Sequence, residues 1–377
     1  MIRRVAAAVR MLRPRTIAEA SARLANTERA VERVRNDVAD LERTVNADRN
    51  GGLDRIEREV TALRDAHQRG LQDMQDKLVA LTRAIAQLQV NDSQLRAIAL
   101  RDAAQDRRIL RLKQTLNERS IAEHVNRRIS GSTLQLHPFP HAVVDDLLPQ
   151  AVYDALLEAI PPVELFANRP FNKQQVGVPL TLGPRYSRHV WQFVARTLAP
   201  RIITPAVLSK FRVPLETWLG ASLAPDAMAL LDRLHMACTD GRILLRGRGY
   251  NIPPHRDPKW GFITCLMYLA RPDDDRSLGT QLYSVTADTD APDTKPHWIP
   301  PDRCRLEATV ELRPNRALIF LNSSGAHGAQ IPDEAPESLE RYIYQFRIGP
   351  GRGQIREVLG SLPPELRSAW EGKIGDY

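Results

Sequence analysis

A heptad repeat in the first third of the chain constrains the fold more than any other feature. Apolar residues recur at alternating steps of three and four, as the a and d positions of a coiled coil do. Arg, Glu, Asp and Gln fill most of the remaining positions, so only a narrow seam can be buried, and it needs a partner helix. The first part of the seam consists of Ala20, Leu24, Thr27, Val31, Val34, Val38, Leu41 and Val45.

A break follows this first part of the seam. Asn50–Gly52 contains two glycines, each of which costs about 1 kcal/mol relative to alanine in a helix interior. The seam restarts at Leu53, weakens around His67 and Gly70, and then resumes. We therefore predict a coiled coil over residues 16–120. Homo-oligomerisation is the use that we favour, and the alternative is a helix pair folded back at Asn50–Gly52.

The charge of the chain and its N-terminus bear on partners and location. The net charge is +8, but no recognisable nucleic-acid module accompanies it, so we expect no nucleic-acid partner. Residues 1–15 are a basic leader with one apolar helical face and without the long apolar region of a signal peptide. A frayed leader is the interpretation that we favour; the alternative is peripheral contact with an anionic membrane at the inner face.

The cysteines and the hydropathy indicate a cytoplasmic protein. Cys238, Cys265 and Cys304 are widely spaced, odd in number and in no metal-ligand pattern, which is typical of reduced thiols rather than disulfides. No stretch approaches the roughly 20 apolar residues that a membrane span needs.

The pattern changes around residues 129–132. Proline, glycine and aromatic residues become frequent, and short apolar runs rich in β-branched residues replace the heptads. Several short strands without intervening helices favour a barrel or a sandwich. The signal between Phe166 and Met236 is mostly helical and predicts a supporting layer. The expected strands are residues 241–250, 262–270, 280–285, 308–312, 317–322 and 341–348. We therefore predict an α+β chain, with a second domain over 132–350 and a tail over 351–377 that ends in a short helix.

Three residues of the second domain are candidate metal ligands. His255 and Asp257 are two positions apart in an extended segment, so their side chains point to the same side. His327 follows the apolar run ALIFLN and a Ser-Ser-Gly turn. Two histidines and one carboxylate on one face of a metal suit non-haem Fe(II) and oxygen chemistry. An HxD pair alone is common in surface turns; the ordered set of ligands and strands favours the metal site.

A longer series of motifs surrounds these residues. In order they are PFPHAVVDDLLP, RGRGYNIPPHRD, FITCLMYLA, LGTQLY, RPNRALIFLNSSGAHGAQ and RYIYQFRI. With them the chain, from about His137 to Gly349, resembles the 2-oxoglutarate/Fe(II)-dependent oxygenase superfamily, in its prolyl-4-hydroxylase-like branch. The resemblance implies a double-stranded β-helix, or jelly-roll (cupin-like) fold. It also implies Fe(II) held by His255, Asp257 and His327, with 2-oxoglutarate as co-substrate and O2 as oxidant in a dioxygenase that hydroxylates its substrate.

The resemblance also assigns a 2-oxoglutarate-binding basic residue. We transfer that role to Arg341, which opens RYIYQFRI, although it lies further beyond the distal histidine than is usual in the family. Arg347 is the alternative, because an even step along a strand keeps both on one side. A buried carboxylate needs a counter-charge, and a guanidinium can bind it through two hydrogen bonds. Candidate hydroxyl donors to the same carboxylate are Tyr268, which we favour, Tyr250, Tyr342 and Tyr344.

The substrate is not readable from the sequence. A glycan, a lipid-linked intermediate and a protein side chain are all compatible with the architecture. Arg246 and Arg248 would suit an anionic substrate or, equally, a solvent-facing strand, and Lys259 and Trp260 line either the mouth of the site or the packing beneath its loop. Two rival functions remain open, a non-catalytic cupin-like binding module on a coiled-coil scaffold and another metal-dependent reaction such as isomerisation.

Overall fold

The computed structural model describes residues 19, 21–41, 53–166, 172–223, 232–287 and 297–371. The chain divides into two compact units, Met1–Ser93 and Gln94–Tyr377. The basic leader and the break at Asn50–Gly52 lie outside the described residues. Among the helices that are described, none combines the length and the apolar character that crossing a membrane requires.

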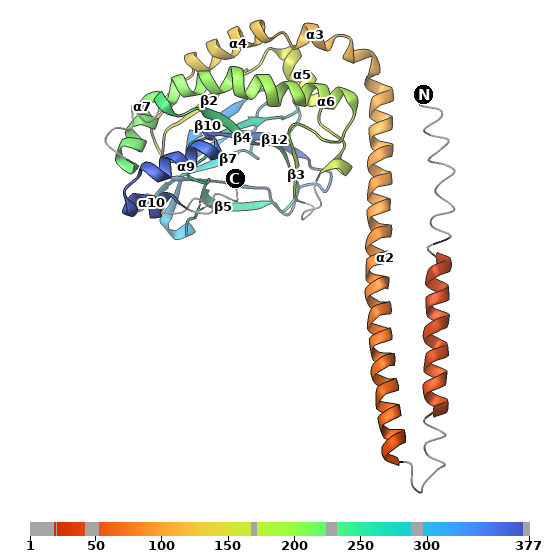
Figure 1. Ribbon diagram of the computed structural model, residues 1–377. Helices are drawn as coiled ribbons and strands as arrows, with labels where there is room; N and C mark the ends of the chain where they lie inside the picture. Colours follow the sequence, from red (N-terminus) through yellow and green to blue (C-terminus); the bar gives the residue numbers. More distant parts are fainter. Residues whose placement is uncertain are drawn as a thin grey trace. The chain divides into compact units, whose positions relative to one another are not determined.

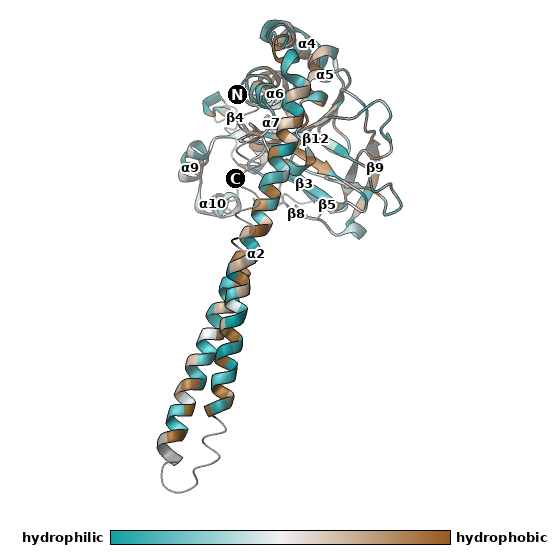
Figure 2. Ribbon diagram, turned by 90° about the vertical axis from the view of Figure 1, so that its right-hand side faces the viewer, coloured by the Kyte–Doolittle hydropathy of each residue, from teal (hydrophilic) through white to brown (hydrophobic). Residues whose placement is uncertain are grey.

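The N-terminal unit is helical. Residues 21–41 form one helix, and α2 (Leu53–Ile109) is a single helix of 57 residues that continues through Gly70. Side chains from both helices, among them Val34, Leu41, Val60 and Met74, line one cavity of about 360 Å³. Apolar and polar residues intermix along α2 (Figure 2). The shared cavity is what a fold-back of one chain gives, and a coiled coil between chains stays a prediction.

The C-terminal unit begins earlier than the predicted boundary at residue 132. Helices α3 (Leu112–Thr115) and α4 (Glu118–Gly131) precede the sheets, and the Asn117 side chain caps α4 by accepting a 3.0 Å hydrogen bond from the Ser120 amide. Leu112, Ile121, Val125 and Ile129 belong to the main hydrophobic core. Helix α3 lies within the range predicted as coiled coil and α4 lies mostly beyond it, and apolar residues of both pack into the core of the C-terminal unit.

Two antiparallel sheets form the centre of this unit (Figure 1). The first has the order β1 (Leu134–Gln135), β2 (His141–Val144), β10 (Ala317–Leu321), β6 (Ile263–Tyr268), β12 (Arg341–Pro350), β4 (Met236–Arg246) and β3 (Lys173–Gly177). The second has the order β8 (His297–Trp298), β5 (Asn251–Arg256), β11 (Ala326–Gln330), β7 (Thr280–Val285) and β9 (Cys304–Val310). From β4 to β12 the chain passes repeatedly between the two sheets. The prediction of several short strands with a supporting layer of helices is confirmed, and the strands pair antiparallel.

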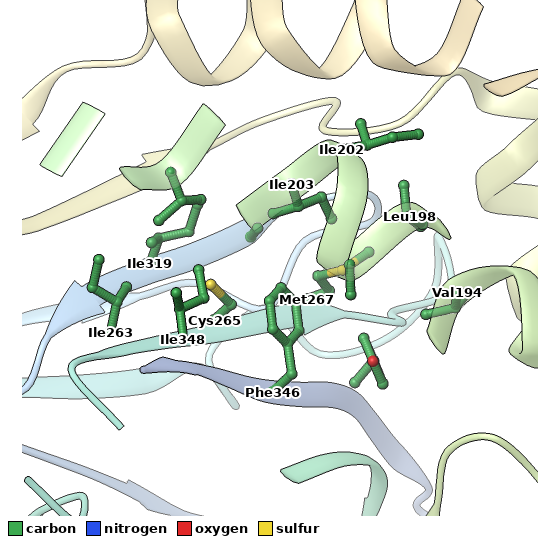
Figure 3. Close-up of a cluster of buried hydrophobic side chains, with 14 of the residues drawn as sticks. Val194, Leu198, Ile202, Ile203, Ile263, Cys265, Met267, Ile319, Phe346 and Ile348 are labelled. Atoms are coloured by element: carbon green, nitrogen blue, oxygen red, sulfur yellow. The ribbon is translucent and has the colours of Figure 1, made fainter. Parts of the chain in front are cut away.

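Helices cover one face of the larger sheet. They are α5 (Gln150–Glu158), α6 (Arg185–Phe193), the π-helical segment η2 (Val194–Ile203) and α7 (Thr204–Ser222). Two short 3-10 turns are η1 (Val163–Leu165), which follows α5, and η3 (Pro301–Arg303), which leads into β9 of the smaller sheet. Figure 3 shows apolar side chains of η2, such as Leu198, clustered with Cys265 of β6, Ile319 of β10 and Phe346 of β12. Alternate residues of the same strands, such as Leu266, form a second core with the smaller sheet.

The C-terminal helices are part of the core rather than a loose tail. They are α9 (Arg352–Ser361) and α10 (Pro364–Trp370). Trp370 is buried, its ring centroid lies 5.0 Å from that of Trp260, and its carbonyl accepts a 2.9 Å hydrogen bond from the Trp260 indole. The Lys259 ammonium lies 4.6 Å from the centroid of the Trp370 ring. Lys259 and Trp260 therefore pack beneath the loop that follows Asp257.

Candidate metal centre

Strand pairing brings the three predicted metal ligands together. β5 and β11 are neighbours in the smaller sheet, and their register places His255 directly opposite His327. The two imidazole centroids are 4.2 Å apart. Asp257 follows the end of β5, and one ligand atom from each of the three buried residues lies within 4.8 Å of the others. Three donors of the types that Fe(II) accepts thus meet at one point.

Hydrogen bonding and packing orient the two imidazoles. His255 Nδ1 lies 2.9 Å from the Pro253 carbonyl oxygen, which makes it the protonated nitrogen and leaves Nε2 as the ligand atom. The other face of the site is aromatic: the Trp298 ring lies 5.1 Å from His255, and the Phe320 ring lies 4.6 Å from His327. A hydrogen bond and ring packing thus position His255, and ring packing positions His327.

A hydrogen-bond network holds the Asp257 carboxylate. Thr264 donates to Oδ2 at 2.7 Å and Arg347 donates to Oδ1 at 2.8 Å. Asn322 in turn donates to the Thr264 hydroxyl at 2.9 Å, and Arg347 also binds Asp240. The sequence reasoning did not find Thr264, Asn322 or Asp240. The one available signal was Thr264 itself, a hydroxyl residue within the apolar run of β6.

The electrostatics of the site favour metal binding. Burial acts to raise the pKa of Asp257, but the positive charge of Arg347, with smaller contributions from His327 and His255, outweighs burial and holds that pKa far below its usual range. Burial lowers the pKa of His327 to about 3, and neighbouring His255 adds to this effect. Burial likewise lowers the pKa of His255. At neutral pH the carboxylate is therefore ionised and both imidazoles are neutral, the states that metal ligation requires.

A cavity of about 280 Å³ adjoins the three ligands. Alternate residues of β12 line it, because successive strand residues point to opposite faces. They are Arg341, Ile343, Gln345 and Arg347. Arg341 and Arg347 thus share one side of the strand, as their spacing predicts. The intervening tyrosines, Tyr342 and Tyr344, belong to the core on the other face of the sheet and do not line the cavity.

The two arginines differ in what they bind. Arg347 is engaged by Asp257 and Asp240. Arg341 donates through Nη2 to the Gly279 carbonyl at 3.1 Å, and its Nε is buried without a hydrogen-bond partner. Within the described parts of the chain, no carboxylate forms an ion pair with Arg341. Because an uncompensated buried cation is costly, Arg341 is the better site for a carboxylate that enters the cavity.

The two tyrosines proposed as co-substrate contacts occupy different places. Tyr250 lines the cavity, and its ring lies 4.8 Å from the Arg246 guanidinium carbon. Tyr268 is buried in the core between the sheets, and its hydroxyl donates to the Thr280 hydroxyl at 2.9 Å. Thr280 lines the cavity and Tyr268 does not. Tyr268 therefore reaches this site through Thr280.

Comparison with known proteins finds distant structural likenesses only. No family model and no curated protein match the sequence. One similar solved structure is a prolyl-4-hydroxylase from Pseudomonas putida, with 12% identity, a TM-score of 0.30, and coverage of 61% of this chain and 98% of that chain. A second is HygX from Streptomyces hygroscopicus with nickel, 2-oxoglutarate and hygromycin B bound, with 10% identity, a TM-score of 0.34, and coverage of 56% and 82%. A third is AviO1 from Streptomyces viridochromogenes, with 12% identity, a TM-score of 0.34, and coverage of 66% and 98%.

Proposed function

We propose that this chain is an Fe(II)- and 2-oxoglutarate-dependent dioxygenase that hydroxylates its substrate. One observation carries the proposal: a buried His–Asp–His set lines the same cavity as a buried arginine, Arg341, that pairs with no carboxylate among the described residues. The alternation of the chain between two antiparallel sheets supports a double-stranded β-helix with the metal between them.

The residues present fit the metal and the co-substrate. His255, His327 and Asp257 would hold Fe(II), and Arg341 would bind the C5 carboxylate of 2-oxoglutarate, the end that does not chelate the metal. When bound, the iron supplies oxygen activation, in which 2-oxoglutarate and O2 yield succinate and CO2 and the second oxygen atom enters the substrate C–H bond.

The side chains of the protein orient the metal ligands and exclude water from the cavity. Thr264 and Arg347 hold Asp257 in one orientation, so the ligand oxygen is in place before a metal arrives. Leu244, Leu266 and Ile343 line the cavity between its polar groups, and these apolar surfaces keep water from the reacting atoms.

Uncoupled turnover tests the proposal without knowledge of the substrate. The purified chain is supplied with Fe(II), 2-oxoglutarate and air, and succinate is measured. We expect iron-dependent succinate formation that His255→Ala and Asp257→Ala abolish. Arg248→Gln is the matched control, because Arg248 pairs with Glu337 and does not line the cavity.

The same assay separates the rival functions. Binding of Fe(II) and 2-oxoglutarate without succinate formation would identify a non-catalytic binding module. Binding of the metal without 2-oxoglutarate would indicate another metal-dependent reaction.

A further inference from the structure

The cavity is lined by more positively charged side chains than are needed to hold Asp257 and to bind one carboxylate of the co-substrate. Among the described residues, Asp257 is the one carboxylate on its wall, and Asp240 pairs with two of the cations, Arg347 and Arg242. Arg341 has its role at the co-substrate. The cationic side chains that line the cavity are Lys173, Arg242, Arg246, Arg341 and Arg347. Arg246 therefore has a charge that the proposed reaction has not yet used.

Arg246 is buried, and its partners among the described residues are neutral. It is the last residue of β4, opposite Arg341 in register on one side and opposite Lys173 on the other. Its Nη1 donates to the carbonyls of Gln174 at 2.7 Å and Leu245 at 3.0 Å. In the part of the chain that the structure describes, no carboxylate pairs with it. A guanidinium this buried is stabilised when an anion binds beside it.

Trp298 supplies a second kind of surface in the same cavity. It lies on β8, the edge strand of the smaller sheet, whereas Arg246 lies next to β3, the edge strand of the larger sheet. The Trp298 side chain is 53% exposed, although its ring lies 5.1 Å from His255. An exposed indole beside a buried metal site offers a flat apolar face that a bound ring can cover. A molecule between Trp298 and Arg246 would lie against the ligand set.

The geometry points to a small substrate that carries an anionic group, either a carboxylate or a phosphate, next to a ring. Arg246 would bind the anionic group, and the ring would lie against Trp298. This inference rests on the proposed oxygenase function and specifies its substrate class. The cavity of about 280 Å³, which the co-substrate would share, lies just below the usual range of small-molecule sites, roughly 300–1,000 Å³. The size favours a small acidic molecule, such as an acidic sugar, over a folded protein surface.

Binding without turnover tests the inference. The full chain is loaded with Mn(II) and 2-oxoglutarate under nitrogen, and glucuronate, glucose 6-phosphate and neutral glucose are titrated by calorimetry. We expect one or both acids to bind at least about tenfold more tightly than glucose, since charge-assisted hydrogen bonds are the stronger ones. Arg246→Gln should remove that preference, and Arg248→Gln should retain it. Trp298→Ala should weaken acid binding and keep the preference.

Each other outcome has a distinct meaning. If neither acid binds the loaded wild type, or if glucose binds as tightly as the acids, the inference is wrong. It is also wrong if Arg246→Gln weakens 2-oxoglutarate binding as strongly as Arg341→Ala does, because Arg246 then belongs to the co-substrate site. Binding of glucuronate would identify a carboxylate as the anionic group, and binding of glucose 6-phosphate would identify a phosphate. Failure of the oxygenase proposal would appear separately, as absence of succinate in air.

Discussion

Arg341 lies on the same side of β12 as Arg347, but it has no carboxylate partner within the described chain. Replacing Arg341 with alanine would leave the C5 carboxylate of 2-oxoglutarate buried without a counter-charge, a loss on the order of 3–5 kcal/mol. We expect the affinity for 2-oxoglutarate to fall by about two to three powers of ten at about 1.4 kcal/mol each, with Mn(II) affinity unchanged. Anaerobic calorimetry on the Mn(II) form measures both. A nearly silent Arg341→Ala would exclude this residue from the co-substrate site.

Arg347 should show the opposite profile. It donates to Asp257 Oδ1 and holds the pKa of that carboxyl low, so Arg347→Ala removes an orienting partner of a metal ligand. Loss of such a partner costs about 10–100-fold in metal affinity. Mn(II) titration measures this loss, and 2-oxoglutarate affinity at saturating Mn(II) is the internal control. If Arg347→Ala binds Mn(II) normally but no longer binds 2-oxoglutarate, the roles assigned to Arg341 and Arg347 are reversed.

The sequence predicts the residues of the candidate site only where local spacing decides. His255 and Asp257 reach one point because alternate residues of an extended chain share a side, and that is visible in the sequence. Thr264 meets Asp257 only because β6 pairs with β12 and places Thr264 opposite Arg347. That register depends on long-range pairing, and Asn322, which follows β10, joins the network through a second such pairing, of β10 with β6.

Strands are predicted well where they are apolar and poorly where they carry the site. β7 and β12 coincide with apolar runs in which β-branched and aromatic residues are frequent. β5 contains two prolines, β11 reads AHGAQ and β3 reads KQQVG, so none of them resembles a buried strand. They form strands because their sheet neighbours supply the hydrogen bonds. Within the mostly helical segment expected between Phe166 and Met236, residues 167–171 and 224–231 lie outside the described residues.

Helix α10 should contribute to stability through one side chain. The Trp370 ring packs against Trp218, Trp260 and Phe262, and Trp260 directly supports the loop after Asp257. We expect Trp370→Ala to lower the free energy of unfolding by about 3–5 kcal/mol, because it leaves a cavity among aromatic rings. Urea denaturation measures the change. Trp298→Ala is the control, since that indole is half-exposed and its loss should cost well under half as much. Equal effects would mean that the tail does not support the core.

The structure divides the chain into units at Ser93 and Gln94, within the range predicted as coiled coil. A heptad seam and the buried face of an amphipathic core helix have nearly the same period, so the pattern could not show where one gives way to the other. Ile121, Val125 and Ile129 continue the apolar spacing beyond the predicted coiled coil, yet they pack into the C-terminal unit. Only the presence of the sheets and their covering helices shows whether an apolar helix face packs in a coiled coil or in a globular core.

The exposed seam of α2 leads to a prediction about assembly. Leu88 and Leu95 lie one heptad apart and are 57% and 53% exposed in the single chain. We propose that a second copy of the chain covers them, at about 1.5–3 kcal/mol for each leucine that becomes fully buried. Leu88→Glu combined with Leu95→Glu should therefore convert an oligomer into a monomer in analytical ultracentrifugation of the full chain. Val90→Glu is the matched control, because Val90 is also exposed on α2 but lies off the seam. If the wild type is a monomer, the seam is buried by the chain folding back on itself and not by a second copy. If Val90→Glu also dissociates the oligomer, the seam is wrongly placed.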